Sequence, residues 1–389
     1  MPLALATAGG ISVLIWGYLL LARGGFWRVA VPREKTMRHG PLTRVAAIVP
    51  ARNEAQVIAR SVGSLIGQAG PVSLHIFVVD DASTDATARL ASEAARAAPA
   101  ALTVIHGAPL PPGWTGKLWA MQQGIEAASR LDPEFLLFTD ADILHAPDNV
   151  AGAVAIAHHG GCDLASFMVK LRCQTTAERL LIPAFVFFFF KLYPPAWVAG
   201  PRRRTAGAAG GCILLRSQAL AKAGGLHSIC GEIIDDCALA RVVKRSGGKV
   251  WLGLADSASS LRAYGSFAEI GRMIARTAFN QLRHSALLLI AAIAGMAVTY
   301  LLPIALVFTG RALPMALGAA AWAMMTLAYL PMVRHYRLNP LWALLLPLAA
   351  VFYMGATLAS ALEFWSGRGG QWKGRVQDGR QQSRSVNSS

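Results

Sequence analysis

The stretch FLLFTDAD (residues 135–142) is an apolar run that ends directly in two carboxylates. Its short length and its aromatic and branched residues predict a buried β-strand over residues 135–138. Asp140 and Asp142 then lie just beyond the carboxyl end of that strand. In open α/β sheets this is the edge at which ligands bind.

Similar runs upstream extend the pattern into a fold. We expect strands at 45–49, 74–79 and 102–105, and helices at 54–69, 84–98 and 118–129 with Ser83 as an N-cap. Strand–helix alternation of this kind predicts an α/β domain with a doubly wound, mostly parallel sheet. The second strand ends in Asp80 and Asp81, so their carboxylates are expected at the same edge as Asp140 and Asp142.

The composition indicates that the protein also has membrane segments. Of the 389 residues, 54% are hydrophobic and only 15% are charged, whereas soluble domains carry about a quarter charged residues. The run Leu3–Ala22 is long enough to cross a bilayer, and no basic residue precedes it. Basic residues follow it instead: Arg23, Arg28, Arg33, Lys35, Arg38 and Arg44. The positive-inside rule therefore predicts an uncleaved anchor, with the next domain in the cytoplasm.

Further apolar stretches predict the remaining organisation. Residues 180–198 combine four consecutive phenylalanines with three prolines and a lysine, which favours an interfacial segment over a buried core helix. Residues 286–309, 313–332 and 341–364 supply two or three spans. The predicted domains are an anchor (1–23), a catalytic domain (40–260, including 180–198), an interfacial helix (261–285), membrane segments (286–365) and a basic tail (366–389).

The bulk charge and the cysteines exclude other classes. The formal charge is +16, but the basic residues cluster beside apolar segments, so we expect a lipid bilayer and no nucleic acid as the partner. The five cysteines form no C-x-x-C pair, which favours reduced thiols over a zinc site.

The carboxylates suggest the chemistry. A D-x-D at a strand end suits Mg²⁺ or Mn²⁺, hard cations that take one or two protein carboxylates beside substrate phosphates. Asp80 and Asp81 repel each other unless donors of a ligand, such as a base N–H or a ribose hydroxyl, approach them. Two solvated loop aspartates are the alternative for Asp140 and Asp142.

Other polar residues complete the predicted nucleotide-sugar site. Pro50, Arg52 and Glu54 occupy the first strand–helix turn, and Lys117 in a glycine-flanked turn can reach a phosphate, although no P-loop spacing is present. Asp235 and Asp236 open a predicted helix. One of them is the candidate general base, because neighbouring carboxylates raise each other's pKa; N-terminal helix charges are the alternative.

Together, PARNE (50–54), VVDDASTD (78–85), GK (116–117), TDAD (139–142), AGGCILLR (209–216) and DDCAL (235–239) resemble family 2 glycosyltransferases of the GT-A fold over residues 45–255. The membrane segments and FVFFFFKLYP resemble a narrower, lipid-acting group that includes ceramide glucosyltransferases and, most closely, the bacterial hopanoid-biosynthesis-associated glycosyltransferases. The resemblance implies inversion in a single displacement. It implies that Asp80 and Asp81 bind the nucleotide base and that Asp140 and Asp142 bind the ribose and the metal–diphosphate. It implies that Asp236 is the general base.

The chain departs from that pattern in two places. The usual Glu-Asp pair is Asp235-Asp236, and the acceptor-side Q-x-x-R-W motif is missing. The candidate replacements on the acceptor side are Gly211, Arg272, Arg276, Gln281 and Arg283. WKGR (372–375) resembles a basic tail motif of the lipid-acting group.

The predicted function is transfer of a sugar from a nucleotide donor, UDP-linked by expectation, to a hopanoid-related membrane lipid. The predicted setting is the bacterial inner membrane, with several spans and a cytoplasmic catalytic domain. A polyprenyl-phosphate acceptor is the near alternative. A nucleotidyltransferase and a non-enzymatic membrane scaffold are readings from other classes, and the missing motif disfavours a processive polysaccharide synthase.

Overall fold

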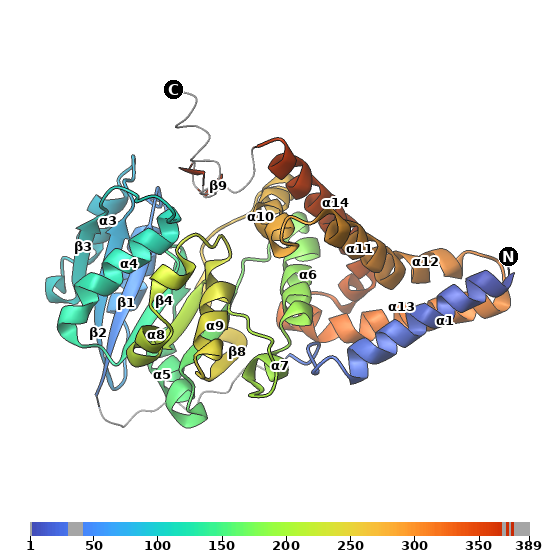
Figure 1. Cartoon of the computed structure of the whole chain (residues 1–389), viewed down its shortest axis with the longest axis horizontal. Coiled ribbons are helices and arrows are strands. Elements are labelled where there is room, and N and C mark those ends of the chain that lie inside the picture. Colours follow the sequence, from blue (N-terminus) through green and yellow to red (C-terminus); the bar gives the residue numbers. More distant parts are fainter. Residues whose placement is uncertain (1, 30–41, 368–370, 373–374, 377–389) are drawn as a thin grey trace. The chain divides into compact units, whose positions relative to one another are not determined.

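The computed structural model describes residues 2–29, 42–367, 371–372 and 375–376, which fall into two compact units. A sheet unit contains residues 42–172 and 198–262, and a helical unit contains residues 2–29, 173–197 and 263–367. The mixed α/β sheet and the apolar helices at both ends of the chain confirm the predicted fold class (Figure 1).

One eight-stranded sheet forms the centre of the sheet unit, in the order β3-β2-β1-β4-β7-β6-β8-β5. The strands are β1 (Thr43–Ala51), β2 (Val72–Asp80), β3 (Leu102–His106), β4 (Phe135–Thr139), β5 (Ile143–His145), β6 (Leu164–Lys170), β7 (Cys212–Arg216) and β8 (Val250–Ser260). β3, β2, β1 and β4 are parallel neighbours, as predicted, and β6 pairs with β8 in parallel. β7 is antiparallel to both β4 and β6, and β5 is antiparallel to β8, so the sheet is more mixed than the sequence pattern indicated.

The central strands are covered on both faces. β1 is buried at every position except Arg44, as expected for a parallel strand between two helical layers. Val45, Ala47 and Val49 belong to a core that includes the buried side of α2 (Ile58–Ile66). On the opposite face α4 (Gly116–Ala128) approaches so closely that a Cβ at Gly124 would lie 2.6 Å from Ile48 Cγ2.

The helices of the sheet unit follow the predicted order with shifted ends. Besides α2 and α4 they are α3 (Thr87–Ala94), α5 (Asn149–Gly160), α8 (Ser217–Lys222) and α9 (Asp235–Arg245), with 3₁₀ turns η1 (Pro99–Ala101), η2 (Ser129–Leu131) and η3 (Leu226–Ile229). α2 begins four residues later than predicted, after Asn53, whose φ of 52° is left-handed. The prediction of Ser83 as an N-cap is wrong, because its hydroxyl accepts the Asn53 N–H at 3.0 Å and α3 starts only at Thr87.

The helical unit contains the apolar helices. They are α1 (Pro2–Leu21), α6 (Thr176–Leu192), α7 (Pro195–Ala199, which continues into the sheet unit), α10 (Phe267–Gln281), α11 (Ala286–Met296), the π-helix η4 (Ala297–Leu301), α12 (Leu302–Val307), α13 (Ala312–His335), the 3₁₀ helix η5 (Pro340–Leu345) and α14 (Leu346–Trp365). Within the described residues, five segments are long and apolar enough to cross a membrane: Leu3–Leu21, Thr176–Ala199, Ala286–Val307, Ala312–His335 and Pro340–Trp365.

The α6 region is a regular helix despite the proline inside it. The helix begins with a capping box, in which the Thr175 hydroxyl accepts the Glu178 N–H and the Glu178 carboxylate accepts the Thr175 N–H, and it continues through Pro183. The interfacial placement of residues 180–198 stays a prediction. Arg33, Lys35, Arg38 and most of the predicted basic tail lie outside the described residues, although β9 (Gln371–Trp372) and β10 (Arg375–Val376) form a short antiparallel pair.

Candidate active site

The predicted carboxylates gather at the carboxyl edge of the parallel strands. Asp80 is the last residue of β2 and pairs in register with Ala51 at the end of β1. Asp140 follows the last residue of β4, whose Phe138 pairs with Ile48 of β1. Parallel neighbours end at one edge, so these side chains converge although they are far apart in sequence.

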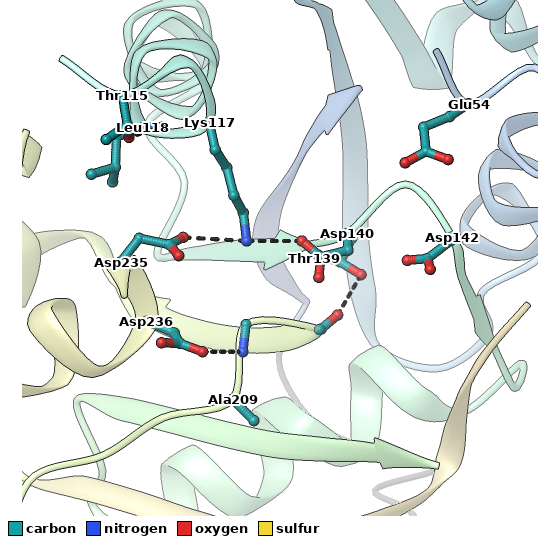
Figure 2. Close-up of polar contacts among 12 residues, drawn as sticks. Glu54, Thr115, Lys117, Leu118, Thr139, Asp140, Asp142, Ala209, Asp235 and Asp236 are labelled. Atoms are coloured by element: carbon teal, nitrogen blue, oxygen red, sulfur yellow. Dashed lines mark hydrogen bonds and ion pairs between the residues drawn. The ribbon is translucent and has the colours of Figure 1, made fainter. Parts of the chain in front are cut away.

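Lys117 joins two of the predicted motifs. Its Nζ lies 2.9 Å from Asp140 Oδ1 and 3.2 Å from Asp235 Oδ2, and Figure 2 shows it between the two carboxylates. The lysine stands in the first turn of α4, which the Thr115 hydroxyl caps by accepting the Leu118 N–H. Burial lowers the pKa of Lys117, but the charges of Asp140 and Asp235 outweigh it and raise the pKa above its usual value. The lysine is therefore a fixed cation at this edge.

Asp236 is the best-placed base in the cluster. Its Oδ2 accepts the Gly210 N–H at 2.8 Å, and its Oδ1 accepts the Cys237 N–H at 2.6 Å. Burial and the adjacent Asp235 charge raise the pKa of Asp236 to about 7, against the lowering effect of Lys117. A carboxylate with a pKa near neutrality can accept a proton at physiological pH and release it again.

A small pocket opens between these groups. Its lining includes Pro50, Lys117, Asp140, Gly210, Asp235 and Asp236. These residues come from five of the sequence motifs. The pocket therefore brings together the end of β1, the start of α4, the end of β4, the segment just before β7 and the start of α9.

Asp142 has separate partners on the other side of Asp140 (Figure 2). Its Oδ2 accepts Arg262 Nε at 2.9 Å and the Ser260 hydroxyl at 3.2 Å. Arg262 Nη2 also donates to Glu54 Oε1 at 2.9 Å. The sequence pattern did not indicate Arg262 or Ser260; Ser260 is the last residue of β8, and Arg262 lies two residues beyond it.

Asp80 and Asp81 lie at the end of β2, and both are buried. Arg52 Nη1 lies 3.5 Å from Asp81 Oδ2 and donates a short hydrogen bond to the Asp81 carbonyl. Asp80 Oδ1 is buried and has no hydrogen-bond partner among the described residues. A buried carboxylate oxygen without a donor is costly, so a ligand that supplies an N–H or O–H would be stabilised there.

The predicted acceptor-side residues lie in both units. Gly211 lies in the sheet unit, where its carbonyl accepts the Thr139 hydroxyl at 2.8 Å and a Cβ would lie 2.8 Å from Val169. Arg276 and Gln281 lie on α10 in the helical unit, where Gln281 Nε2 donates to the Tyr193 hydroxyl at 2.8 Å. Arg283 follows α10 with a left-handed φ of 53°. Their acceptor role stays a prediction.

The oxygen donors of Asp140 and Asp142 suit a hard divalent cation that keeps substrate phosphates as its other ligands. Among the described residues no group of three or more His, Cys, Asp or Glu side chains could hold a metal without such help.

Comparison with known proteins indicates the class. Residues 46–224 match the family model described as glycosyl transferase family 2. The chain is 33% identical over 144 residues to polyprenol monophosphomannose synthase of Mycolicibacterium smegmatis, a match over 35% of this chain and 52% of that protein. The chain thus spans about half the length of this curated relative.

A solved structure has a similar fold over most of the chain. A mannosyltransferase from Pyrobaculum calidifontis, in complex with GDP-Man and Mn²⁺, matches with a TM-score of 0.57 at 20% identity. The match covers 92% of this chain and 98% of that protein. At this level of identity the comparison supports the GT-A-like fold with its helical segments.

Proposed function

We propose that this protein is an inverting glycosyltransferase that moves a sugar from a nucleoside diphosphate donor to a lipid acceptor in the membrane. The observation that carries the proposal is the meeting of Lys117, Asp140 and Asp235 beside Asp236 at the carboxyl edge of the sheet. In the proposal, Lys117 is the cation that faces the diphosphate, Asp140 is a carboxylate for the metal, and Asp236, with its raised pKa, is the base.

In this proposal the donor lies across the ends of β1, β2 and β4. Asp80 and Asp81 accept hydrogen bonds from the base or ribose, and the orphan Asp80 oxygen supports that role. Pro50 at the end of β1, and Arg52 and Glu54 in the turn after it, would border the donor, and Lys117 would face the diphosphate. Asp140 and Asp142 would hold Mg²⁺ or Mn²⁺, which would neutralise charge on the departing nucleoside diphosphate.

In the proposed reaction, Asp236 accepts the proton that the acceptor hydroxyl loses. The acceptor hydroxyl attacks the anomeric carbon, the bond from that carbon to the diphosphate oxygen breaks, and the hydroxyl proton passes to Asp236. A single displacement inverts the anomeric configuration. General-base catalysis of this kind contributes roughly 10²–10⁴-fold to rate.

The proposal includes two classes of acceptor, which differ in whether they need Asp236 as a general base. A lipid hydroxyl, as in a hopanoid-related acceptor, must lose a proton on attack, which matches a carboxylate with a pKa of about 7. A polyprenyl phosphate is supported by the likeness to polyprenol monophosphomannose synthase. Its phosphate oxygen is already anionic and needs no base. Substitution of Asp236 should therefore slow transfer to a hydroxyl by roughly 10²–10⁴-fold and spare transfer to a phosphate.

The first experiment combines donor binding with product analysis. Thermal shifts of the purified chain are measured with UDP- and GDP-linked sugars, with and without Mn²⁺, and in the D142A variant. We expect metal-dependent stabilisation by one donor in the parent and none in D142A. Turnover should then release a nucleoside diphosphate. Release of pyrophosphate would indicate nucleotidyl transfer and overturn the proposal, and a scaffold would show no donor binding.

The proposed setting is the bacterial inner membrane with the sheet unit in the cytoplasm. The five apolar segments and the basic residues after α1 support this arrangement. Cysteine labelling in intact cells tests this arrangement. A membrane-impermeant reagent should fail to label a cysteine introduced at exposed Arg60. Labelling at this position would show that the sheet unit lies on the opposite side of the membrane.

A further inference from the structure

The loop from Gly200 to Arg204 is an exposed basic feature of the sheet unit that the proposed chemistry does not use. Arg202, Arg203 and Arg204 are consecutive and exposed. The sequence contains no Asp or Glu between Glu178 and Glu232, so no acid near in sequence offsets this charge. Within the described part of the chain, neither Arg202 nor Arg204 makes an ion pair.

The loop is fixed at both ends by one helix. Lys244 of α9 donates a hydrogen bond to the Thr205 carbonyl at 2.8 Å and a short one to the Val198 carbonyl. At the other end of α9, Asp236 accepts the Gly210 N–H at 2.8 Å. The backbone that carries the arginines is therefore held in place, and all three residues are exposed.

The position of the arginines in the chain suggests their partner. The candidate span Thr176–Ala199 ends just before them, with only Gly200 and Pro201 between. Basic clusters directly beside a span face the headgroup layer, where acidic phospholipids attract them. Arginine suits this partner because its planar guanidinium can bind a phosphate through two parallel N–H bonds.

We propose that the Arg202–Arg204 loop docks on the phosphate groups of acidic phospholipids at the bilayer surface. The proposal concerns the surface of the sheet unit and stands independently of the donor and acceptor of the transfer reaction. Because α9 joins this loop to the Asp236 carboxylate, the docking surface and the candidate base share one rigid support.

The test places the full chain in lipid nanodiscs and measures hydrogen–deuterium exchange of the peptide 198–205. Discs of phosphatidylcholine alone are compared with discs that also contain phosphatidylglycerol. We expect slower exchange in the anionic discs, by roughly fivefold for each arginine engaged. Added salt should reduce the difference, because exposed charge contacts are screened.

Variants separate the loop from general charge effects. R202Q/R203Q/R204Q should lose the difference between the two discs. The control R60Q/R96Q/R130Q removes three other exposed arginines and should keep it. D236N should also keep it, so the result does not depend on transferase activity. Equal exchange in both discs, or an equal loss in the control, would overturn the proposal. Protection produced only by polyprenyl phosphate in neutral discs would instead assign the arginines to an acceptor phosphate and also overturn it.

Discussion

The pH dependence of transfer to a hydroxyl acceptor should reveal the charges around Asp236. The base must be deprotonated to accept a proton, so kcat/KM should rise with pH through an inflection near the Asp236 pKa of about 7. Lys117 lowers this pKa and Asp235 raises it. We therefore expect Lys117→Met to move the inflection to higher pH and Asp235→Asn to move it to lower pH.

The size of these shifts follows from Coulomb's law. At an effective dielectric constant of about 20, a unit charge about 6 Å away contributes roughly 3 kcal/mol. That energy corresponds to about two pKa units, which we take as the upper bound for each variant. The opposite signs of the two shifts are the sharper part of the prediction, because a loss of donor affinity changes the height of the profile and leaves its inflection in place.

The assay is kcat/KM against pH for the parent chain and both variants in one lipid system, with subsaturating acceptor and saturating donor. Asp236→Asn is the reference and should be slower by roughly 10²–10⁴-fold, with no inflection near neutrality. A parent profile that is flat through pH 7 would refute the assignment of Asp236 as the base. Shifts of the same sign in the two variants would refute the electrostatic reasoning.

Four further predictions concern stability and metal binding. Gly124→Val should lower the unfolding free energy by about 1–3 kcal/mol, because α4 touches the sheet there. Gly63→Ala, at an open helical position, should raise it by roughly 0.4–1 kcal/mol in the same thermal or denaturant assay. Arg262→Gln should lower the melting temperature. Added Mn²⁺ should raise the melting temperature by more in this variant than in the parent, because the cation would replace the lost charge at Asp142. Equal increases in the variant and the parent would contradict this. Glu178→Ala should cost about 1–3 kcal/mol, since this buried carboxylate accepts several backbone N–H groups, and an unchanged melting curve would count against that account.

Local patterns carried most of the fold prediction. The apolar runs that became β1, β2, β3 and β4 were recognised because parallel strands buried on both faces are continuously hydrophobic. Helix starts were less predictable. α2 and α3 both begin late because Asn53 and Ser83 hydrogen-bond between their two loops, a contact over 30 residues that no local pattern contains.

The D-x-D stretch shows the division most clearly. The sequence alone determined that Asp140 and Asp142 follow a buried strand and that Asp80 ends its parallel neighbour, because side-chain periodicity and strand polarity are local properties. Only the tertiary structure decided that Asp140 faces Lys117 and Asp235, whereas Asp142 faces Arg262, a residue 120 positions away. The raised pKa of Asp236 likewise arises from burial and from charges supplied by other elements. Such electrostatic effects depend on distances of a few ångströms, and those distances are set by packing of the whole sheet unit.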